Sequence, residues 1–297
     1  MKKLNIIGCG RIGKTLGRLW HERGCFKIQD VLNRSLTSAS QAVSFIGEGR
    51  AISAYSEMEE ADCIMISTAD QSIADCAVLL METGCVKNGT IVFHCSGSLS
   101  STILEGLKAS GVLIASIHPV KSFADPELAV SSFAGTYCGV EGDNTACDFL
   151  SKVLSQCGGS VFRINREDKL LYHAGSVIVC NYLVALIEAG LVCYEQAGID
   201  RDEALRIMQP IMAGTIANVA RLGTAQALTG PIARGEAGIV EQQCQALARL
   251  DRRIEAIYKT LGLITVDLSR MQGGASETSL LRMVESFNES GLGGQSD

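Results

Sequence analysis

A glycine-rich turn near the beginning of the chain has the spacing of a dinucleotide-binding motif, G-x-G-x-x-G. It follows the apolar residues 4–7 and consists of Gly8, Cys9, Gly10, Arg11, Ile12 and Gly13. In this motif the first glycine permits a tight turn, the second lets the backbone approach a pyrophosphate, and the third lets helix and strand pack closely. The phosphates bind the N–H groups that begin the following helix. We expect a cofactor here, contacted by Gly8, Gly10, Arg11, Ile12 and Gly13; the alternative is a turn with no ligand.

The residues about 20 positions further on bear on which dinucleotide binds, because an NAD site usually places an acidic residue there to hold the ribose hydroxyls. Here the tip of the second predicted strand carries Asn33, Arg34 and Ser35, and Asp30 lies earlier, inside the strand. A cation beside a hydroxyl suits a 2′-phosphate. The sequence therefore favours NADP over NAD; the alternative is that Arg34 is a solvated loop residue.

Three further polar segments follow predicted strands, and ligands of such sheets bind at the carboxyl ends of the strands. In the first segment, residues 67–73, Thr68 is a plausible cofactor contact, and Asp70 is as readily explained as a helix N-cap. The second, residues 94–98, contains His94 and Ser96, and the third begins with His118. A histidine there can donate to a substrate carbonyl or carboxylate and titrates near neutral pH. Each histidine alone is also compatible with a structural role.

The long helical pattern over residues 168–197 supplies another candidate group. His173, Val177 and Asn181 are four residues apart, so they drift only about 80° around one face. His173 and Asn181 therefore lie about 12 Å apart along the helix axis and could line one pocket. Helix–helix hydrogen bonding is the alternative role. Arg234, in the loop of residues 229–236, could clamp a carboxylate or belong to an ordinary surface loop.

The elements that must position these residues change in kind along the chain. Short apolar runs alternate with helical patterns up to about residue 165, which predicts βαβ units and a largely parallel sheet. Helical patterns follow at residues 168–197, from Asp200 onwards with a kink or restart at Pro210, at 236–261 and at 278–287. Residues 290–297 are Gly/Ser-rich and predicted to fray. We predict two domains, residues 1–165 and 166–297.

Composition excludes several classes of function. The 297 residues are 47% hydrophobic and 20% charged, with a net charge of −6 and no dense Lys/Arg block, which argues against nucleic-acid and anionic-membrane binders. The 12 cysteines form no Cys-x-x-Cys and have no zinc spacing, so we expect most of them to be buried apolar residues in a reducing cytoplasm. Residues 170–187 lack charge and reach the lower limit for a membrane span. His173, Ser176 and Asn181 within them favour a helix buried inside a soluble protein.

Taken together, the motifs resemble the Rossmann-like NADP oxidoreductases that carry a helical domain of unknown function after the cofactor domain. These are relatives of pyrroline-5-carboxylate reductase, ketopantoate reductase, prephenate dehydrogenase and the β-hydroxyacid dehydrogenases. The resemblance covers nearly the whole chain and rests on residues 8–13, 33–35, 94–97, 118–123, 172–174 with Asn181, and 228–235. It implies a doubly wound Rossmann sheet, a C-terminal all-helical domain, NADP as cofactor and a homodimer built through the helical domain.

The chain departs from these families near the start of the long helix. The β-hydroxyacid dehydrogenases place a catalytic lysine there with an asparagine one turn on, whereas His173 stands near that place, Val177 follows it, and Asn181 lies a further turn away. We therefore expect a cytoplasmic NADP-dependent oxidoreductase acting on a small oxo, hydroxy or imino acid, with His118 or His173 as general acid/base and Asn181 and Ser96 orienting the substrate. The alternatives are a non-catalytic NADP(H)-binding sensor or regulatory protein and, ranked last, a reductase serving a flavin or metal.

Overall fold

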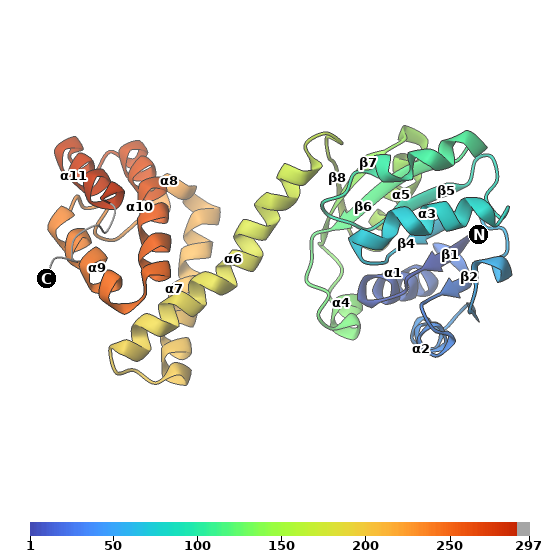
Figure 1. The fold of residues 1–297 in the computed structure, drawn as a ribbon, viewed down its shortest axis with the longest axis horizontal. Helices are drawn as coiled ribbons and strands as arrows, with labels where there is room; N and C mark the ends of the chain where they lie inside the picture. The colour runs from blue at the N-terminus through green and yellow to red at the C-terminus, as the bar shows by residue number, and fades with distance from the viewer. Residues whose placement is uncertain (290–297) are drawn as a thin grey trace, which may run out of the picture. The chain divides into compact units, whose positions relative to one another are not determined.

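The computed structural model describes residues 1–289 and separates into two compact units (Figure 1). The first unit is Met1–Tyr182, and the second begins at Leu183, inside the long helix α6 (Lys169–Gln196). The change from mixed strands and helices to helices alone occurs at the start of α6. Each unit is described by itself below.

An eight-stranded sheet forms the centre of the first unit. Its order is β3-β2-β1-β4-β5-β6-β7-β8, and every neighbouring pair is parallel except β6 and β7. The strands are β1 (Lys2–Ile7), β2 (Phe26–Leu32), β3 (Arg50–Ile52), β4 (Cys63–Ile66), β5 (Ile91–His94), β6 (Leu113–Pro119), β7 (Tyr137–Gly142) and β8 (Ser160–Arg163). The order of the first six strands is that of the doubly wound dinucleotide-binding fold, which confirms the predicted fold class.

Both faces of this sheet are covered, as a parallel sheet requires. One face buries residues of α1 (Arg11–Glu22), α2 (Leu36–Ile46) and α5 (Asn144–Gln156), with Trp20 at its centre. The other face buries residues of α3 (Ile73–Glu82) and the 3-10 helix η3 (Ser101–Ser110). The remaining short helices of this unit are η1 (Tyr55–Glu57), η2 (Asp70–Ser72) and α4 (Pro126–Ser131). This arrangement leaves the carboxyl ends of β1, β2, β4, β5 and β6 along one edge.

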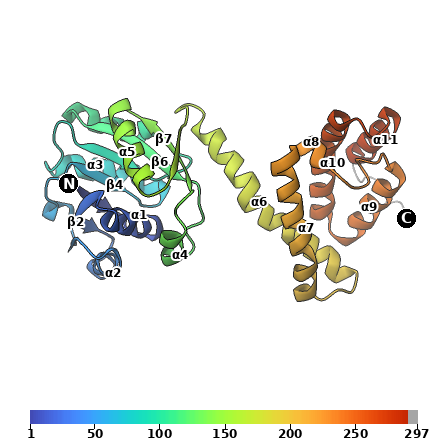
Figure 2. The same cartoon turned by 180° about the vertical axis from the view of Figure 1, so that it is seen from behind.

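The second unit contains the C-terminal part of α6 and five further helices: α7 (Arg201–Leu222), α8 (Thr224–Ala227), α9 (Ala237–Leu250), α10 (Arg252–Gln272) and α11 (Glu277–Asn288). Helices α9, α10 and α11 pack around one apolar core (Figures 1 and 2). The single helix predicted over residues 236–261 is wrong, because Asp251 ends α9 and its side chain caps α10. Pro210 lies inside α7, which neither ends nor restarts there. The predicted fraying of 290–297 lies outside the described residues.

The predicted burial of α6 inside the chain is wrong. Helix α6 is long and apolar enough to cross a membrane by length and composition, and only 6% of its most apolar 18-residue window is buried. Large side chains such as Ile178, Val179 and Val184 are more than half exposed. Contact of such an apolar surface with water is unfavourable.

The predicted role of most cysteines as buried apolar residues is confirmed. All 12 are free thiols, and the nine buried ones are Cys9, Cys63, Cys76, Cys85, Cys95, Cys138, Cys147, Cys157 and Cys244.

Candidate functional site

The glycine turn between β1 and α1 has the geometry that its motif predicts. Gly8 has a φ of +76°, and a Cβ built on it would lie 2.2 Å from Cγ2 of Thr68. A Cβ on Gly13 would lie 2.5 Å from Oγ of Ser67, so α1 packs tightly against the β4 end. A Cβ on Gly10 would meet only the Gly8 carbonyl, at 3.9 Å, which leaves the middle of the turn open. The open position is where a pyrophosphate would approach the backbone.

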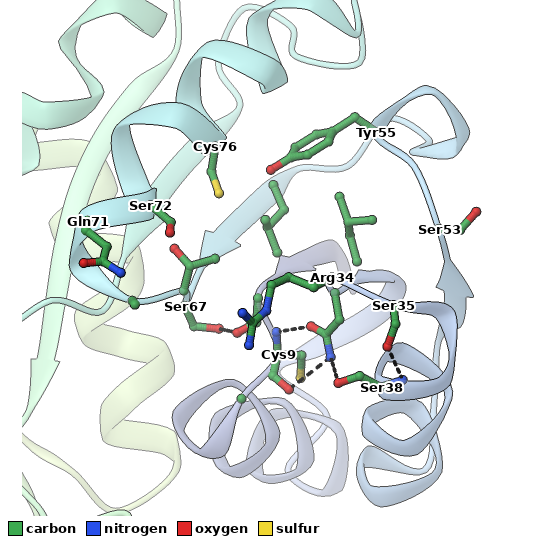
Figure 3. A pocket seen from close by; sticks show the side chains of 17 residues that line it. Cys9, Arg34, Ser35, Ser38, Ser53, Tyr55, Ser67, Gln71, Ser72 and Cys76 are labelled. Atoms are coloured by element: carbon green, nitrogen blue, oxygen red, sulfur yellow. Dashed lines mark hydrogen bonds between the residues drawn. The ribbon is translucent and has the colours of Figure 1, made fainter.

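A cavity of about 640 Å³ extends from this turn along the ends of β1, β2 and β4 (Figure 3). Asn33 binds the turn to the tip of β2, because its Oδ1 accepts from the Cys9 N–H at 2.6 Å and its Nδ2 donates to Ser38. Ser35 caps α2 by accepting from the Ser38 N–H. Asn33, Arg34 and Ser35 thus all line the cavity, as predicted, and Asn33 also shapes it.

Arg34 is the one charged residue among the described residues that line this cavity. Arg34 lines the cavity and forms no hydrogen bond or ion pair with any other residue of the described chain. The nearest acidic candidate, Asp30, is fully buried, and its carboxylate accepts from Arg50 Nε and the Glu59 N–H, both at 2.8 Å. Asp30 therefore stabilises the start of β3 and cannot bind a ribose at the strand tip.

A second cavity of about 460 Å³ shares Ser67, Thr68 and Ala69 with the first and also contacts Arg11 and Ile12. Its other side is residues 122–124, which follow β6. The Thr68 hydroxyl is buried and has no hydrogen-bond partner among the described residues. Because a buried hydroxyl without a partner is costly, its position favours a ligand that accepts or donates there.

Two histidines converge beyond this second cavity. His118 is on β6 and His173 on α6, and their ring centroids are 5.6 Å apart. Gly97, in the loop after β5, lies between them: a Cβ there would be 2.7 Å from His118 Nε2 and 2.5 Å from His173 Nδ1. The structure thus brings together the two histidines chosen from the sequence, and both rings lie so close to Gly97 that a side chain there would clash with them. Burial lowers the pKa of His118 to about 4, so this imidazole is neutral at pH 7.

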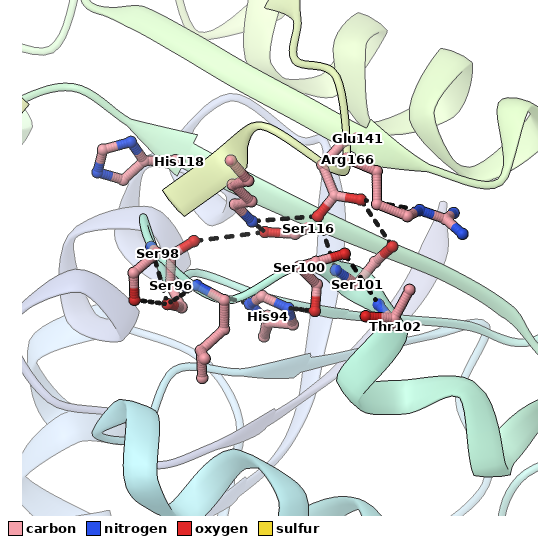
Figure 4. A network of polar contacts seen from close by, with 12 residues as sticks. His94, Ser96, Ser98, Ser100, Ser101, Thr102, Ser116, His118, Glu141 and Arg166 are labelled. Carbon is pink, nitrogen blue, oxygen red and sulfur yellow. Dashed lines mark hydrogen bonds and ion pairs between the residues drawn. The ribbon is translucent and has the colours of Figure 1, made fainter. Parts of the chain in front are cut away.

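His94 and Ser96 shape the loop that carries Gly97 (Figure 4). The His94 ring is fully buried and bridges the loop, with Nδ1 accepting from the Ser96 N–H and Nε2 3.3 Å from the Ser100 carbonyl. Burial lowers the pKa of His94 to about 4. The Ser96 hydroxyl donates to Asp70 at 2.8 Å and accepts from the Leu99 N–H at 2.9 Å. Its proton is engaged within the protein, so the prediction that Ser96 orients substrate is not supported by this geometry.

Asp70 joins the loop after β4 to the loop after β5. Its Oδ2 accepts from the hydroxyls of Ser96 and Ser98, both at 2.8 Å. The helix N-cap role considered for Asp70 is wrong, since Ser72 is the N-cap of α3 and neither η2 nor α3 has a side-chain cap. Asp70 instead follows Ala69, which lines both cavities, and its hydrogen bonds connect that segment to the loop that carries Gly97.

A buried ion pair that the sequence did not reveal lies beneath the same loop. Nζ of Lys169, the first residue of α6, is 3.1 Å from Glu141 Oε1 and also donates to Ser116 Oγ. Lys169 and Glu141 are 1% and 3% exposed. Burial lowers the pKa of Lys169, and the opposing effect of Glu141 is smaller. A lysine therefore does begin the long helix, contrary to the placement of His173 there, but its ammonium is engaged with Glu141.

The other end of this network reaches the loop after β5. Glu141 accepts from both the N–H and the hydroxyl of Ser101, each at 2.7 Å. Arg166 Nε lies 3.5 Å from the second oxygen of Glu141 (Figure 4). The pair therefore ties the start of α6 to the start of η3, which follows the loop that carries Gly97.

One predicted residue of the first unit is not brought to this group. Asn181 is exposed on α6 and forms no hydrogen bond with the described residues. Arg234 pairs with Glu236 through two contacts of 2.9 Å in an exposed loop of the second unit. Within residues 1–289, no group of three His, Cys, Asp or Glu side chains is arranged to bind a metal.

Comparison with known families identifies both parts of the chain. A Rossmann-like domain model matches residues 2–119, and a model described as a domain of unknown function, DUF2520, matches residues 136–265. The chain is thus similar to a Rossmann-like domain over its first part and to DUF2520 over the part that follows. The DUF2520 match includes β7, α5 and β8 as well as helices of the second unit. His118 therefore comes from the Rossmann-like match and His173 from the DUF2520 match. No curated protein sequence matches the chain.

Solved structures with the same two-part fold span nearly the whole chain. Protein TM1727 from Thermotoga maritima has a TM-score of 0.73 at 26% identity, covering 91% of this chain and 99% of that one. BF3122 from Bacteroides fragilis, described as a proposed NADP oxidoreductase, has a TM-score of 0.71 at 19% identity, with coverage of 90% and 98%. A reductive aminase from Aspergillus terreus, in complex with NADPH, has a TM-score of 0.65 at 16% identity, with coverage of 95% and 98%. These likenesses establish the fold of the Rossmann-like and DUF2520 domains together.

Proposed function

We propose that this protein is an NADP-dependent oxidoreductase that moves a hydride between the nicotinamide and a carbon of a small oxo, hydroxy or imino acid. The observation that carries the proposal is the continuity of the site. The cavity at the glycine turn shares Ser67–Ala69 with the second cavity, and Asp70 then contacts the loop over which His118 and His173 converge. A cofactor lying along the sheet edge would end beside the two histidines.

The residues present fit such a cofactor. The open position at Gly10 suits the pyrophosphate, Arg34 and Ser35 suit a 2′-phosphate, and the unpartnered Thr68 hydroxyl suits a group further along. When bound, the cofactor supplies the hydride chemistry, and the protein supplies orientation and polarisation. The oxidoreductase and reductive aminase named above are proteins of the same fold, which supports this assignment.

The two histidines would act on the substrate. Nε2 of His118 and Nδ1 of His173 both lie close to Gly97, and the Nδ1 is buried and has no hydrogen-bond partner among the described residues, so one small polar group of a substrate could contact both. A neutral imidazole there can donate a hydrogen bond to a carbonyl or imine as hydride arrives, or accept one from an alcohol in the reverse direction. His118 is our choice for the acid/base because Tyr172 holds its ring in place.

Binding and turnover measurements test this assignment. We expect NADPH to bind, and oxidation of NADPH with one member of a panel of oxo and imino acids to fall at least about 100-fold in His118→Ala. His173→Ala tests the second histidine in the same assay. His21→Ala is the matched control, because His21 pairs with Glu48 away from the site. If NADPH binds but turnover is unchanged in both His118→Ala and His173→Ala, the enzyme assignment is overturned and a non-catalytic NADP(H)-binding sensor is the function that stands. If NADP(H) does not bind, both assignments are overturned.

Cofactor preference gives a separate prediction. Replacing Arg34 by alanine should weaken NADPH binding about 10- to 100-fold, the equivalent of one or two charge-assisted hydrogen bonds, and leave NADH binding nearly unchanged. Titration of both nucleotides by fluorescence measures the two dissociation constants. Arg23→Ala is the control, since Arg23 is an exposed arginine at the opposite end of α1. Equal losses for NADPH and NADH would contradict a 2′-phosphate site at Arg34.

We also propose that two copies associate through the helical part. Helix α6 exposes Ile178, Val179 and Val184, and α7 exposes Ile211 and Ile216, each 58% exposed or more. A second copy would cover these side chains and remove apolar surface from water. The protein should sediment at twice the 31.5 kDa chain mass, and Val179→Glu with Val184→Glu should yield monomers. Val78→Glu, an exposed valine on α3, should not. A wild-type monomer, or co-sedimentation with lipid vesicles, would contradict the dimer.

A further inference from the structure

His118 has a partner that the sequence did not assign. The Tyr172 hydroxyl lies 2.8 Å from His118 Nδ1, and the two rings meet edge to face, with centroids 5.5 Å apart at 84°. The other ring nitrogen, Nε2, lies beside Gly97, 2.7 Å from the position that a Cβ on Gly97 would take. In a neutral imidazole, the group that binds one ring nitrogen therefore determines whether the other nitrogen is a hydrogen-bond donor or an acceptor.

The surroundings of Tyr172 indicate which way this hydrogen bond runs. Among residues 1–289, the hydroxyl has no hydrogen-bond partner besides His118, so its proton has one protein acceptor, Nδ1. Burial raises the pKa of Tyr172, so the hydroxyl keeps its proton at neutral pH. Burial also keeps the His118 ring neutral, which leaves one of its nitrogens as an acceptor.

The tyrosine ring is held from two sides. Phe162 on β8 packs edge to face against it with centroids 5.9 Å apart, and Lys169, three residues earlier on α6, is anchored to Glu141. A hydroxyl fixed in this way loses little side-chain freedom when it binds His118.

We propose that Tyr172 is a positioning residue: its hydroxyl donates to Nδ1 of His118, which places the ring proton on Nε2, the nitrogen that lies beside Gly97 and His173. The proposal rests on the proposed function, because it assigns a task to His118 in that reaction. It also restricts the class of functional group that His118 can bind in a substrate. An Nε2–H donor binds a carbonyl oxygen or a neutral imine nitrogen, which have lone pairs, and it does not bind the nitrogen of an iminium ion, which has none.

NMR of the imidazole nitrogens tests the proposal without a substrate. In protein labelled with 15N at histidine, two-bond 1H–15N correlations at pH 7 should show His118 as the neutral Nε2–H tautomer. His94 is an internal reference, because its Nδ1 accepts from the Ser96 N–H and its Nε2 faces the Ser100 carbonyl. An Nδ1–H tautomer for His118 in the wild-type protein would overturn the proposal, and this result needs no variant.

The Tyr172→Phe variant keeps the ring packing against Phe162 and removes only the donor. We expect the ratio of the Nε2–H to the Nδ1–H tautomer of His118 to fall about tenfold, as loss of one hydrogen bond implies, with the His94 signals unmoved. Tyr258→Phe is the matched control, because its hydroxyl donates to Gln243 in the helical part. Unchanged His118 signals in Tyr172→Phe would overturn the positioning role.

The two proposals fail in distinguishable ways. If NADPH binds but the His118 signals are unchanged in Tyr172→Phe, the positioning role of Tyr172 is wrong and the oxidoreductase assignment stands. If NADP(H) does not bind but His118 has the expected Nε2–H tautomer, the oxidoreductase assignment is wrong and the effect of Tyr172 on the His118 ring stands. If an active substrate is a ketone or neutral imine, kcat in Tyr172→Phe should fall at least about fivefold while the NADPH dissociation constant stays unchanged. Turnover of a permanently charged iminium at the wild-type rate in Tyr172→Phe and in His118→Ala alike would contradict the substrate class.

Discussion

Replacing Lys169 by methionine should lower the free energy of unfolding of the first unit by about 3–5 kcal/mol, the usual consequence of removing one partner of a buried ion pair. The Glu141 carboxylate is 3% exposed, and without Lys169 its nearest cation is Arg166, at 3.5 Å. Ser116 loses its donor in the same change. A charge left in the interior with incomplete partners is what makes the substitution costly.

Urea unfolding followed by tryptophan fluorescence measures this effect in the correct part of the chain. Trp20 is the single tryptophan, is fully buried, and lies in the core that covers one face of the sheet. Lys108→Met is the matched control, because Lys108 pairs with Asp143 at 2.9 Å but is 36% exposed, and exposed pairs contribute about 1 kcal/mol or less. The prediction would be contradicted if Lys169→Met lowers the free energy of unfolding by no more than Lys108→Met does.

The double variant Lys169→Met with Glu141→Gln separates charge from packing. A glutamine still accepts one hydrogen bond from Ser101 and carries no charge, so the double variant should be more stable than Lys169→Met alone. If the double variant is as unstable as the single one, lost packing of the lysine side chain, not an unpaired carboxylate, is the cause.

This ion pair could not be read from the sequence because it depends on strand register. Glu141 lies directly opposite Ser116 in the antiparallel pairing of β6 with β7, and Lys169 contacts both from the start of α6. Apolar runs indicate where strands lie along the chain. They do not indicate that β7 and β8 run opposite to the other six strands. A lysine at the start of an apolar helix was a visible signal, but its partner was not.

The glycine turn and the histidine pair could be predicted because their positions follow from local rules. The motif fixes the turn between one strand and one helix, and polar residues after parallel strands gather at one edge of the sheet. His118 follows from that rule, and His173 followed from its place on the long helix. Ser96 follows the same rule, but its hydroxyl already donates to Asp70, a contact that the rule does not predict.

The surroundings of α6, in contrast, could not be predicted from the sequence. Its apolar composition predicts a helix, and apolar composition alone does not say whether the same chain, a second copy or a membrane covers it. Asn181 was predicted to line a pocket because buried amides need partners, but it is exposed in this chain. Helical periodicity gives the face on which a residue lies, and not what packs on that face.

Replacing Gly8 by alanine should weaken NADPH binding at least about 100-fold, equivalent to about 2.7 kcal/mol. Gly8 has a φ of +76°, where a side chain costs about 1–2 kcal/mol, and the new Cβ would lie 2.2 Å from Cγ2 of Thr68. The backbone of Thr68 is also within 3 Å, so a rotation of its side chain cannot relieve the clash. The turn must therefore move, which displaces the N–H groups that would hold the pyrophosphate and the Thr68 hydroxyl together.

Gly89→Ala is the control that isolates this clash from backbone strain. Gly89 has a φ of +83°, close to that of Gly8, but a Cβ there has no atom within 4 Å. Both variants should lose a similar amount of stability from the strained backbone, and only Gly8→Ala should lose NADPH binding in a fluorescence titration. Equal NADPH affinity in the two variants would mean that the turn between β1 and α1 does not contact the cofactor. Because the oxidoreductase assignment depends on that turn, the same result would remove its main support.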